Sequence, residues 1–163
     1  MPTADELIRM CALETSAGPW LLLAGSREAD FAPLQQLFET LSQSPTTVLL
    51  EQQPFISVSG QLSLELCSRT DPPSKHRFSL SQLKTKLQDY SMARLLWIDE
   101  TAGSHQWIGT PEEWAERALL LEPLVRKQTP GHVYLNDSAA DVADIVVSRG
   151  EYENLLKQTQ PER

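Results

Sequence analysis

The chain has 163 residues and a formal net charge of −8, with 40% apolar and 22% charged residues. This length suits one domain with a hydrophobic core and is too short for two domains of ordinary size. The acidic balance repels phosphate backbones, so we expect no direct binding of nucleic acid. No apolar run approaches the ~18 residues that a membrane span needs, and the N-terminus lacks the basic and apolar pattern of a signal peptide. Together these features predict a cytoplasmic protein.

Two cysteines, Cys11 and Cys67, lie far apart and show no metal-binding spacing. We expect both thiols to be packed in a reducing compartment rather than bridged. The three histidines likewise show no metal spacing, so no metal and no cofactor is expected. Among the tryptophans, Trp20, Trp97 and Trp114 lie on the buried faces of predicted elements, whereas Trp107 stands beside a turn and is the one expected to be exposed.

Helical and continuous apolar segments alternate along the first 50 residues. Thr3 and Glu6 have the spacing of a capping box, and Asp30 is expected to cap a second, amphipathic helix. The predicted elements, in order, are a helix over 3–14, a strand over 20–24, a helix over 30–41 and a strand over 48–50. Strand, helix and strand in this order form a βαβ unit, whose crossover should be right-handed.

Apolar and polar residues alternate strictly between Ile56 and Leu66. This pattern predicts one long strand, or a strand bulged at Gly60, with one face in water. The wet face carries no lysine or proline to protect an edge from pairing, so the strand is predicted to meet a second copy or another protein. The candidate partner surface consists of Ile56, Ser57, Val58, Ser59, Gln61, Leu62 and Trp107.

The second half of the chain continues the alternation. Thr110 and Pro111 mark the clearest helix start in the sequence, because a cap is followed by proline at the first helical position. The predicted elements are a helix over 79–87, a strand over 93–100, a short strand or packed loop over 106–108, a helix from 110, a strand over 133–135, a helical turn and short strand within 137–150, and a helix over 151–158. Residues 1–158 are predicted to form one domain, with a frayed tail over 159–163.

The continuous apolar runs set the predicted fold class. A run that is apolar at consecutive positions is typical of a strand buried on both faces, as in the centre of a parallel sheet. We therefore expect an α/β fold of three layers, with a mainly parallel sheet of about five to seven strands and helices on both faces. The alternative is an α+β fold with an antiparallel sheet.

Polar residues follow two of the predicted strands. The run from Ala93 ends in Asp99 and Glu100, and Asn136 follows the strand over 133–135. Ligands of parallel sheets bind beyond the carboxyl ends of the strands, so Asp99, Glu100 and Asn136 form a candidate strand-end site. An alternative interpretation is a strand end with solvated acids, and for Asn136 a turn or helix cap.

This order of elements resembles a degenerate P-loop nucleotidase core of the RecA-like kind. Such cores place a phosphate loop after the first strand, an Asp-Glu pair after a buried strand and a polar sensor after a later one. Here the phosphate loop is incomplete: counted from Gly25, the second glycine falls on Asp30, the lysine on Phe31 and the Ser/Thr on Ala32. A carboxylate and a phenyl ring cannot hold a phosphate, so we expect no binding of ATP or GTP.

The best interpretation is a non-catalytic subunit that binds another protein or a second copy of itself, similar to pseudo-ATPase regulatory or adaptor subunits. One alternative is a small acidic secretion-chaperone or immunity-type protein, since an acidic surface suits basic targets. An enzyme alternative is a metal-dependent hydrolase that holds a divalent ion on Asp99 and Glu100. The sequence shows no second acid cluster to complete such a site.

Overall fold

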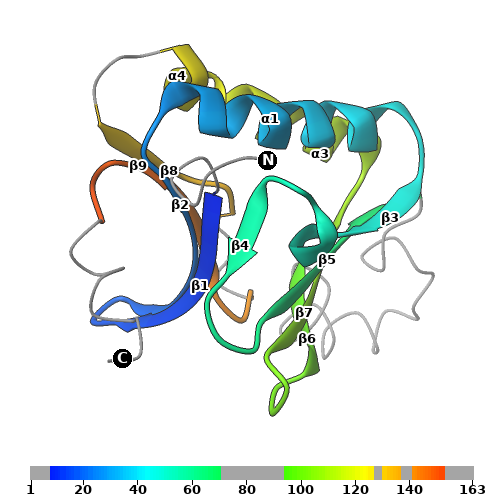
Figure 1. The fold of residues 1–163 in the computed structure, drawn as a ribbon. Helices are drawn as coiled ribbons and strands as arrows, with labels where there is room; N and C mark the ends of the chain where they lie inside the picture. The colour runs from blue at the N-terminus through cyan, green and yellow to red at the C-terminus, as the bar shows by residue number, and fades with distance from the viewer. Residues whose placement is uncertain (1–7, 71–93, 127–129, 137–140, 153–163) are drawn as a thin grey trace, which may run out of the picture.

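The computed structural model describes residues 8–70, 94–126, 130–136 and 141–152 (Figure 1). Within them the strands form two β-sheets, with a layer of helices across one side. The strands are β1 (Ile8–Thr15), β2 (Gly18–Gly25), β3 (Thr46–Leu49), β4 (Ile56–Val58), β5 (Ser63–Ser68), β6 (Leu95–Asp99), β7 (Ser104–Gly109), β8 (Gly131–Tyr134) and β9 (Asp144–Arg149). The helices are α1 (Glu28–Gln43), η2 (Leu50–Gln52), α3 (Pro111–Leu120) and α4 (Glu122–Arg126).

The first sheet has the strand order β4-β1-β2-β9-β8. β1 and β2 form an antiparallel hairpin, in which Met10 is the partner of Leu23. β4 adds to β1 in parallel, β9 adds to β2 in parallel, and β8 closes the sheet antiparallel to β9. Segments from both ends of the chain therefore lie side by side in one sheet.

The second sheet has the order β3-β5-β7-β6. Its central strands β5 and β7 are parallel, and β3 and β6 flank them in antiparallel pairing. All of its strands come from the middle of the chain. Figure 1 shows this sheet beside the first, with β4 as the strand of the first sheet drawn nearest to it. Helices α1 and α3 lie across the top of both sheets.

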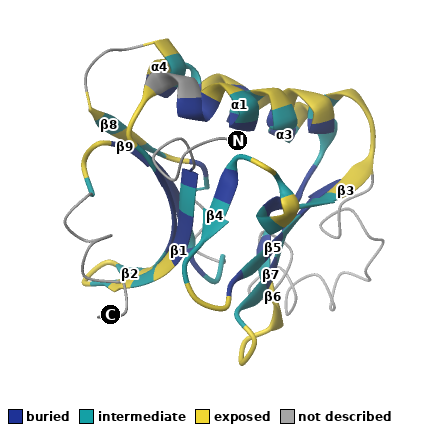
Figure 2. Ribbon diagram, viewed as in Figure 1, coloured by how far each residue is buried: buried dark blue, intermediate teal, exposed yellow. Residues whose placement is uncertain are grey.

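One hydrophobic core fills the space between the two sheets and the helices (Figure 2). Aromatic rings sit at its centre: Phe38 of α1 packs against Trp107 and Trp114, with ring centroids 5.7 and 5.2 Å away. Trp114 is fixed further by an indole N–H that donates to the backbone oxygen of Cys67 at 3.0 Å. Thr110 caps α3 as predicted, since its hydroxyl accepts from the backbone N–H of Glu113.

A smaller cluster covers the opposite face of the first sheet. It is built from Cys11, Leu22, Ala24 and Val146, with Leu13, Trp20 and Tyr152 packed against it. β2 is thus buried on both faces, which explains its continuous apolar run and confirms a strand over 20–24. The cysteines are free and buried, Cys11 in this cluster and Cys67 in β5, so the prediction of packed thiols is confirmed.

The predicted three-layer, mainly parallel sheet is wrong. The described strands divide between two mixed sheets, and the parallel pairs are outnumbered by antiparallel neighbours. Two segments caused the error. The region 8–15, predicted as part of a helix, is a strand because pairing with β2 and burial of Ile8 and Met10 override its helical spacing. The run over 95–98, predicted as a central strand, lies at the edge of the second sheet.

The prediction of one strand over 56–66 is also wrong, although its pattern was informative. The chain crosses from the first sheet to the second between β4 and β5, with Gly60 at φ +79° in the connection. A positive φ is open to glycine at little cost, which permits the sharp change of direction. Ile56 and Leu64 both face the common core. The alternation of apolar and polar residues therefore continues although the chain passes from one sheet to the other.

The helix over 30–41 and the strands over 48–50, 106–108, 133–135 and 145–147 are confirmed as α1, β3, β7, β8 and β9, with shifted ends. Helix α1 begins earlier than predicted, because Asp30 is not its N-cap but lies three residues after the cap, Arg27. The helix over 79–87 lies outside the described residues, as do most of the helix over 151–158 and the tail over 159–163.

Candidate functional site

The predicted strand-end site is not assembled in the structure. Asp99 is exposed at the end of β6, where its carboxylate accepts the backbone N–H of Ala102 at 3.2 Å and holds the hairpin turn to β7. Glu100 follows it in the same exposed turn. Asn136 lies beside the opposite end of β6, because its partner Asp141 binds the backbone of Arg94 and Leu95. The parallel arrangement that would gather these residues at one sheet edge is absent from the described strands.

Asn136 and Asp141 instead join the two sheets. The Asn136 amide donates to Asp141 at 2.8 Å and to the backbone oxygen of Ala143 at 2.9 Å, and its oxygen accepts the N–H of Ile145 at 2.6 Å. Asp141 accepts the backbone N–H groups of Arg94 at 2.6 Å and Leu95 at 3.0 Å. These contacts tie the ends of β8 and β9 to the start of β6. The polar atoms of Asn136 and the carboxylate of Asp141 are therefore engaged in hydrogen bonds within the protein.

Arg117 of α3 is buried beside this network. Its guanidinium lies 4.4 Å from the ring centres of both Trp107 and Trp114, and one nitrogen donates to the backbone oxygen of Ile108 at 3.1 Å. Burial lowers the pKa of Arg117 to about 10, against the opposing effect of Glu113. The guanidinium thus stays charged at neutral pH, and the faces of the two indole rings favour the cation.

The second terminal nitrogen of Arg117 faces the protein interior. It has no hydrogen-bond partner among the described residues. A Cβ placed on Gly109 would lie only 2.4 Å from it, so this nitrogen rests over the glycine backbone. Glycine at position 109 provides the space for the guanidinium.

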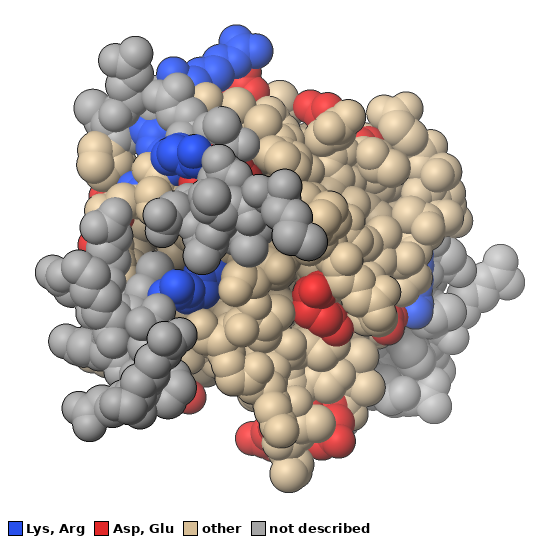
Figure 3. Space-filling view, viewed as in Figure 1, with Lys and Arg blue, Asp and Glu red and all other residues tan. Residues whose placement is uncertain are grey.

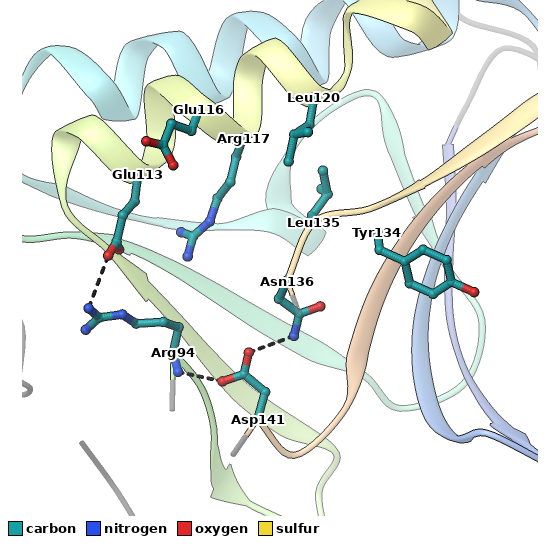
Figure 4. Close-up of a pocket in the computed structure, with 9 residues that line it drawn as sticks. All are labelled: Arg94, Glu113, Glu116, Arg117, Leu120, Tyr134, Leu135, Asn136 and Asp141. Atoms are coloured by element: carbon teal, nitrogen blue, oxygen red, sulfur yellow. Dashed lines mark hydrogen bonds and ion pairs between the residues drawn. The ribbon is translucent and has the colours of Figure 1, made fainter. Parts of the chain in front are cut away.

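A pocket of about 420 Å³, the α3 pocket, opens above these groups (Figure 4). Figure 4 shows Arg94 pointing toward Glu113, and Asp141 lying between Arg94 and Asn136. Arg94 and Glu113 form an ion pair at 3.1 Å, and Glu113 also accepts the backbone N–H of Thr110. Most polar groups of the α3 pocket are thus occupied by one another. Its full lining is Arg94, Glu113, Glu116, Arg117, Leu120, Tyr134, Leu135, Asn136 and Asp141.

The loop before α1, where a P-loop would hold phosphate, is closed by the protein's own carboxylate. Asp30 accepts the backbone N–H groups of Ser26 at 3.2 Å and Arg27 at 2.9 Å, and its other oxygen pairs with the Arg27 side chain at 3.0 Å. Phe31 is fully buried, and its ring lies against Gly25. The resemblance to a RecA-like core stays a prediction, and this loop has the form of an ordinary helix cap.

A second pocket, of about 360 Å³, lies between the two sheets. We call it the inter-sheet pocket. One wall comes from the β1–β2 hairpin, the other from β6, β7 and the segment before β9. Its lining is Ala12, Leu13, Glu14, Pro19, Trp20, Leu21, Trp97, Glu100, His105, Val142 and Ala143. Glu14 and Glu100 are the charged members of this set, and both are exposed.

The β6–β7 wall of the inter-sheet pocket is aromatic. The ring of Trp97 lies over His105 with centroids 4.1 Å apart, and 40% of Trp97 is exposed. His105 is buried, and its Nδ1 lies 3.0 Å from the backbone oxygen of Gly103. Because a carbonyl oxygen only accepts, Nδ1 carries the proton, and Nε2 is left as an acceptor without a partner among the described residues. Burial lowers the pKa of His105, against the backbone oxygens of Gly103 and Ser63, so the ring is neutral at pH 7.

The candidate partner surface predicted on the 56–66 segment is largely internal. Trp107, expected to be exposed, is fully buried, and Ile56 and Leu62 are each only 8% exposed. Ser57, Val58 and Ser59 are partly buried, and Gln61 is exposed in the crossing between sheets. The exposures predicted for two tryptophans are thus reversed, because Trp107 lies on the core side of a central strand and Trp97 on an edge strand.

Sequence reasoning missed Arg117, His105 and Asp141. Arg117 falls three residues after Trp114 on α3, which places both on one face, and this spacing was the available signal. His105 and Trp107 are two residues apart in β7 and so share a face, but only the burial of Trp107 would have revealed that of His105. Nothing in the sequence placed Asp141 beside β6.

No described helix is long and apolar enough to cross a membrane. In the described part of the chain, no three His, Cys, Asp or Glu side chains gather where they could hold a metal ion. Asp99 and Glu100 therefore have no third ligand there.

A scan against protein-family models, a search of curated proteins and a search of solved structures each returned no match for this chain.

Proposed function

We propose that the protein is a non-catalytic binding subunit that docks another polypeptide on the surface around Trp97 and Ile98. The observation that supports this most directly is the exposure of these side chains, 40% for Trp97 and 55% for Ile98. Trp97 lines the inter-sheet pocket, and Ile98 is the next residue of β6. Large apolar side chains next to a concave pocket are typical anchors of protein interfaces, and tryptophan is enriched among them. We call Trp97, Ile98 and the inter-sheet pocket the docking surface.

The backbone of β6 adds a polar component to the docking surface. The N–H and C=O of Leu95 point away from β7, since the N–H donates to Asp141 and the C=O accepts from Val142. Backbone direction alternates along a strand, so the N–H and C=O of Trp97 also point outward. A partner segment in extended form can therefore hydrogen-bond to Trp97 while its side chains contact the pocket.

The length of β6 limits that pairing. The register with β7 shifts between Trp97 and Asp99, and two acids follow. Short, irregular and charged edges resist pairing with other strands over long stretches. Most of the binding free energy should therefore come from side chains that enter the pocket and contact Trp97 and Ile98.

The charge of the surface favours a basic partner. The net charge of the chain is −8. Figure 3 shows acidic atoms on both sides of the β6–β7 hairpin, which projects at the lower edge of the molecule. Charge of this sign repels a second copy of the chain and attracts basic polypeptides. The proposal therefore favours a different protein over a homodimer.

The test compares two variants in which one exposed leucine or isoleucine becomes lysine. Ile98→Lys places an ammonium group on the docking surface, whereas Leu119→Lys makes the same kind of change on α3, at a side chain that is 70% exposed and lines neither pocket. Wild type and both variants are used to capture proteins from a lysate of the native host, with quantitative mass spectrometry as the readout. Circular dichroism establishes that each variant is folded.

We expect at least one protein to be captured by wild type and by Leu119→Lys but not by Ile98→Lys. Partners captured equally by all three proteins would contradict it. Sedimentation of the isolated protein tests for a homodimer. If a dimer forms and Ile98→Lys dissociates it, the partner on the docking surface is a second copy of the chain and not a different protein.

A further inference from the structure

We infer that the inter-sheet pocket receives a basic side chain of the partner, a lysine or an arginine. This inference rests on the proposed docking function and specifies what the docking surface recognises. It depends on the charges of the pocket, the chemistry of its aromatic wall and the contrast with the α3 pocket.

The charges of the inter-sheet pocket have a single sign. Glu14 enters from the β1–β2 hairpin and Glu100 from the β6–β7 turn. Neither carboxylate has an ion-pair partner among the described residues, and none of the described residues that line the pocket is lysine or arginine. Two unpaired carboxylates that approach the same cavity from two sheets attract a cation and repel an anion.

The aromatic wall suits a cation for a second reason. The indole face of Trp97 carries partial negative charge, and tryptophan is the strongest of the aromatic side chains in binding ammonium and guanidinium groups. The ring is partly exposed and held in place by its contact with His105. A guanidinium or ammonium group could therefore lie against Trp97 with its N–H groups directed at the carboxylates.

His105 does not oppose the cation. Its ring is neutral at pH 7, because burial lowers its pKa below the ordinary 6.5. Its Nε2 is buried, so the ring meets the pocket as an uncharged aromatic surface. A neutral imidazole leaves the attraction of the two carboxylates for a cation unopposed, whereas a protonated ring would repel the cation.

The α3 pocket lacks these properties, although it also contains carboxylates. Arg94 and Arg117 line it, and Arg94 already pairs with Glu113 at 3.1 Å. A ligand cation there would compete with the protein's own arginines. The volume of the inter-sheet pocket, about 360 Å³, falls in the range of pockets that hold small ligands, about 300–1,000 Å³, and accommodates one long side chain.

The experiment uses blocked amino acids as probes of the isolated protein. N-acetyl-arginine amide and N-acetyl-lysine amide carry the cation, N-acetyl-norleucine amide replaces it with an apolar chain, and N-acetyl-glutamate amide reverses the charge. Each is titrated to tens of millimolar while the ¹H–¹⁵N signal of the Trp97 indole is followed by NMR. The signal is assigned by its absence in Trp97→Phe.

We expect saturable shifts with the arginine and lysine probes and weaker binding, by about fivefold or more, for the norleucine and glutamate probes. The double variant Glu14→Gln/Glu100→Gln should weaken the cationic probes about three- to tenfold, as loss of two exposed charge pairs predicts. The matched control Glu39→Gln/Glu112→Gln removes the same charge from exposed acids on α1 and α3 and should leave binding unchanged.

Equal binding of the norleucine probe would overturn the inference and indicate an apolar site. Equal weakening by both double variants would also overturn it, because the effect would then come from net charge alone. Absence of any shift with the cationic probes would do the same. These outcomes are independent of partner capture: cationic probes that bind the pocket while Ile98→Lys keeps every partner would uphold the cation site and refute the docking surface.

Discussion

Both pockets are lined by carboxylates, but those of the α3 pocket are largely bonded to other groups of the protein and those of the inter-sheet pocket are not. In the α3 pocket, Asp141, Glu113 and Asn136 are bonded to one another or to backbone groups of β6 and α3. In the inter-sheet pocket, Glu14 and Glu100 form no ion pair with any described residue, and Trp97 is partly exposed, so these groups are not engaged in the described part of the fold. A polar group that is satisfied internally contributes to stability, and one that is left unsatisfied at a cavity is available to a partner. The two pockets should therefore respond differently to mutation.

The largest effect is expected from Asp141→Ala. This change removes an acceptor from the backbone N–H groups of Arg94 and Leu95, where β6 begins, and from the Asn136 amide. Because the donors are left partly buried without partners, the free energy of unfolding should fall by about 2–4 kcal/mol. Urea denaturation measures it, and Asp99→Asn serves as the control, with an expected loss below about 1 kcal/mol at an exposed turn. Equal losses would contradict a structural role for the hydrogen bonds of Asp141 and Asn136.

Gly109→Ala tests the space for Arg117. The new Cβ would lie 2.4 Å from a guanidinium nitrogen and 3.1 Å from the indole nitrogen of Trp114. Displacement of these buried groups should cost about 1–3 kcal/mol, as overpacking does elsewhere. Arg117→Leu removes the clashing group, so in a double-mutant cycle the alanine should cost less in that background. Strictly additive losses would show that Gly109 acts independently of Arg117.

Titration of His105 tests the inter-sheet pocket. Its pKa is lowered by burial in the folded state, so below pH 6.5 the unfolded chain binds more protons than the folded one. Stability from this group is complete above pH 6.5 and is lost as the pH falls toward the folded pKa, by at most about 1.4 kcal/mol per pH unit. Urea denaturation between pH 7.5 and 5 should show a shallower decline in His105→Gln than in wild type. An identical slope would contradict a neutral, buried imidazole.

The smallest effect is expected from the acids of the inter-sheet pocket. Glu14→Gln/Glu100→Gln should change the free energy of unfolding by less than about 0.5 kcal/mol, because both carboxylates are exposed and neither pairs with a cation among the described residues. The same urea experiment measures it. A loss as large as that of Asp141→Ala would remove the difference between the two pockets.

Local signals in the sequence predicted several elements correctly. The cap at Thr110 with Pro111, and the apolar run over 20–24, each depend on contacts close in sequence or on burial of the whole strand. The failures come from tertiary pairing. Ile8 and Met10 lie in a strand only because β2 and β4 flank it, and no pattern within residues 8–15 specifies those neighbours.

The candidate site was predictable only in part. Glu100 and Asn136 do line pockets, but different ones, because their association depended on a parallel sheet. Trp97 was expected in the core since its neighbours Leu96 and Ile98 are apolar. An apolar run at the rim of an interface and one in a buried strand have the same composition, and only the position of β6 at an edge separates them.

The parallel pairing of β2 with β9 has a consequence for synthesis of the chain. Leu21 pairs with Ile145, so the apolar edge of β2 has no neighbour on that side until the ribosome has passed the C-terminal strand. At about 5–20 residues per second, this interval lasts on the order of ten seconds. The strands of the second sheet are all made within it and can form first. A nascent chain stopped before residue 144 would leave the edge of β2 opposite β1 without a partner strand, with the tendency to aggregate that an open apolar edge carries.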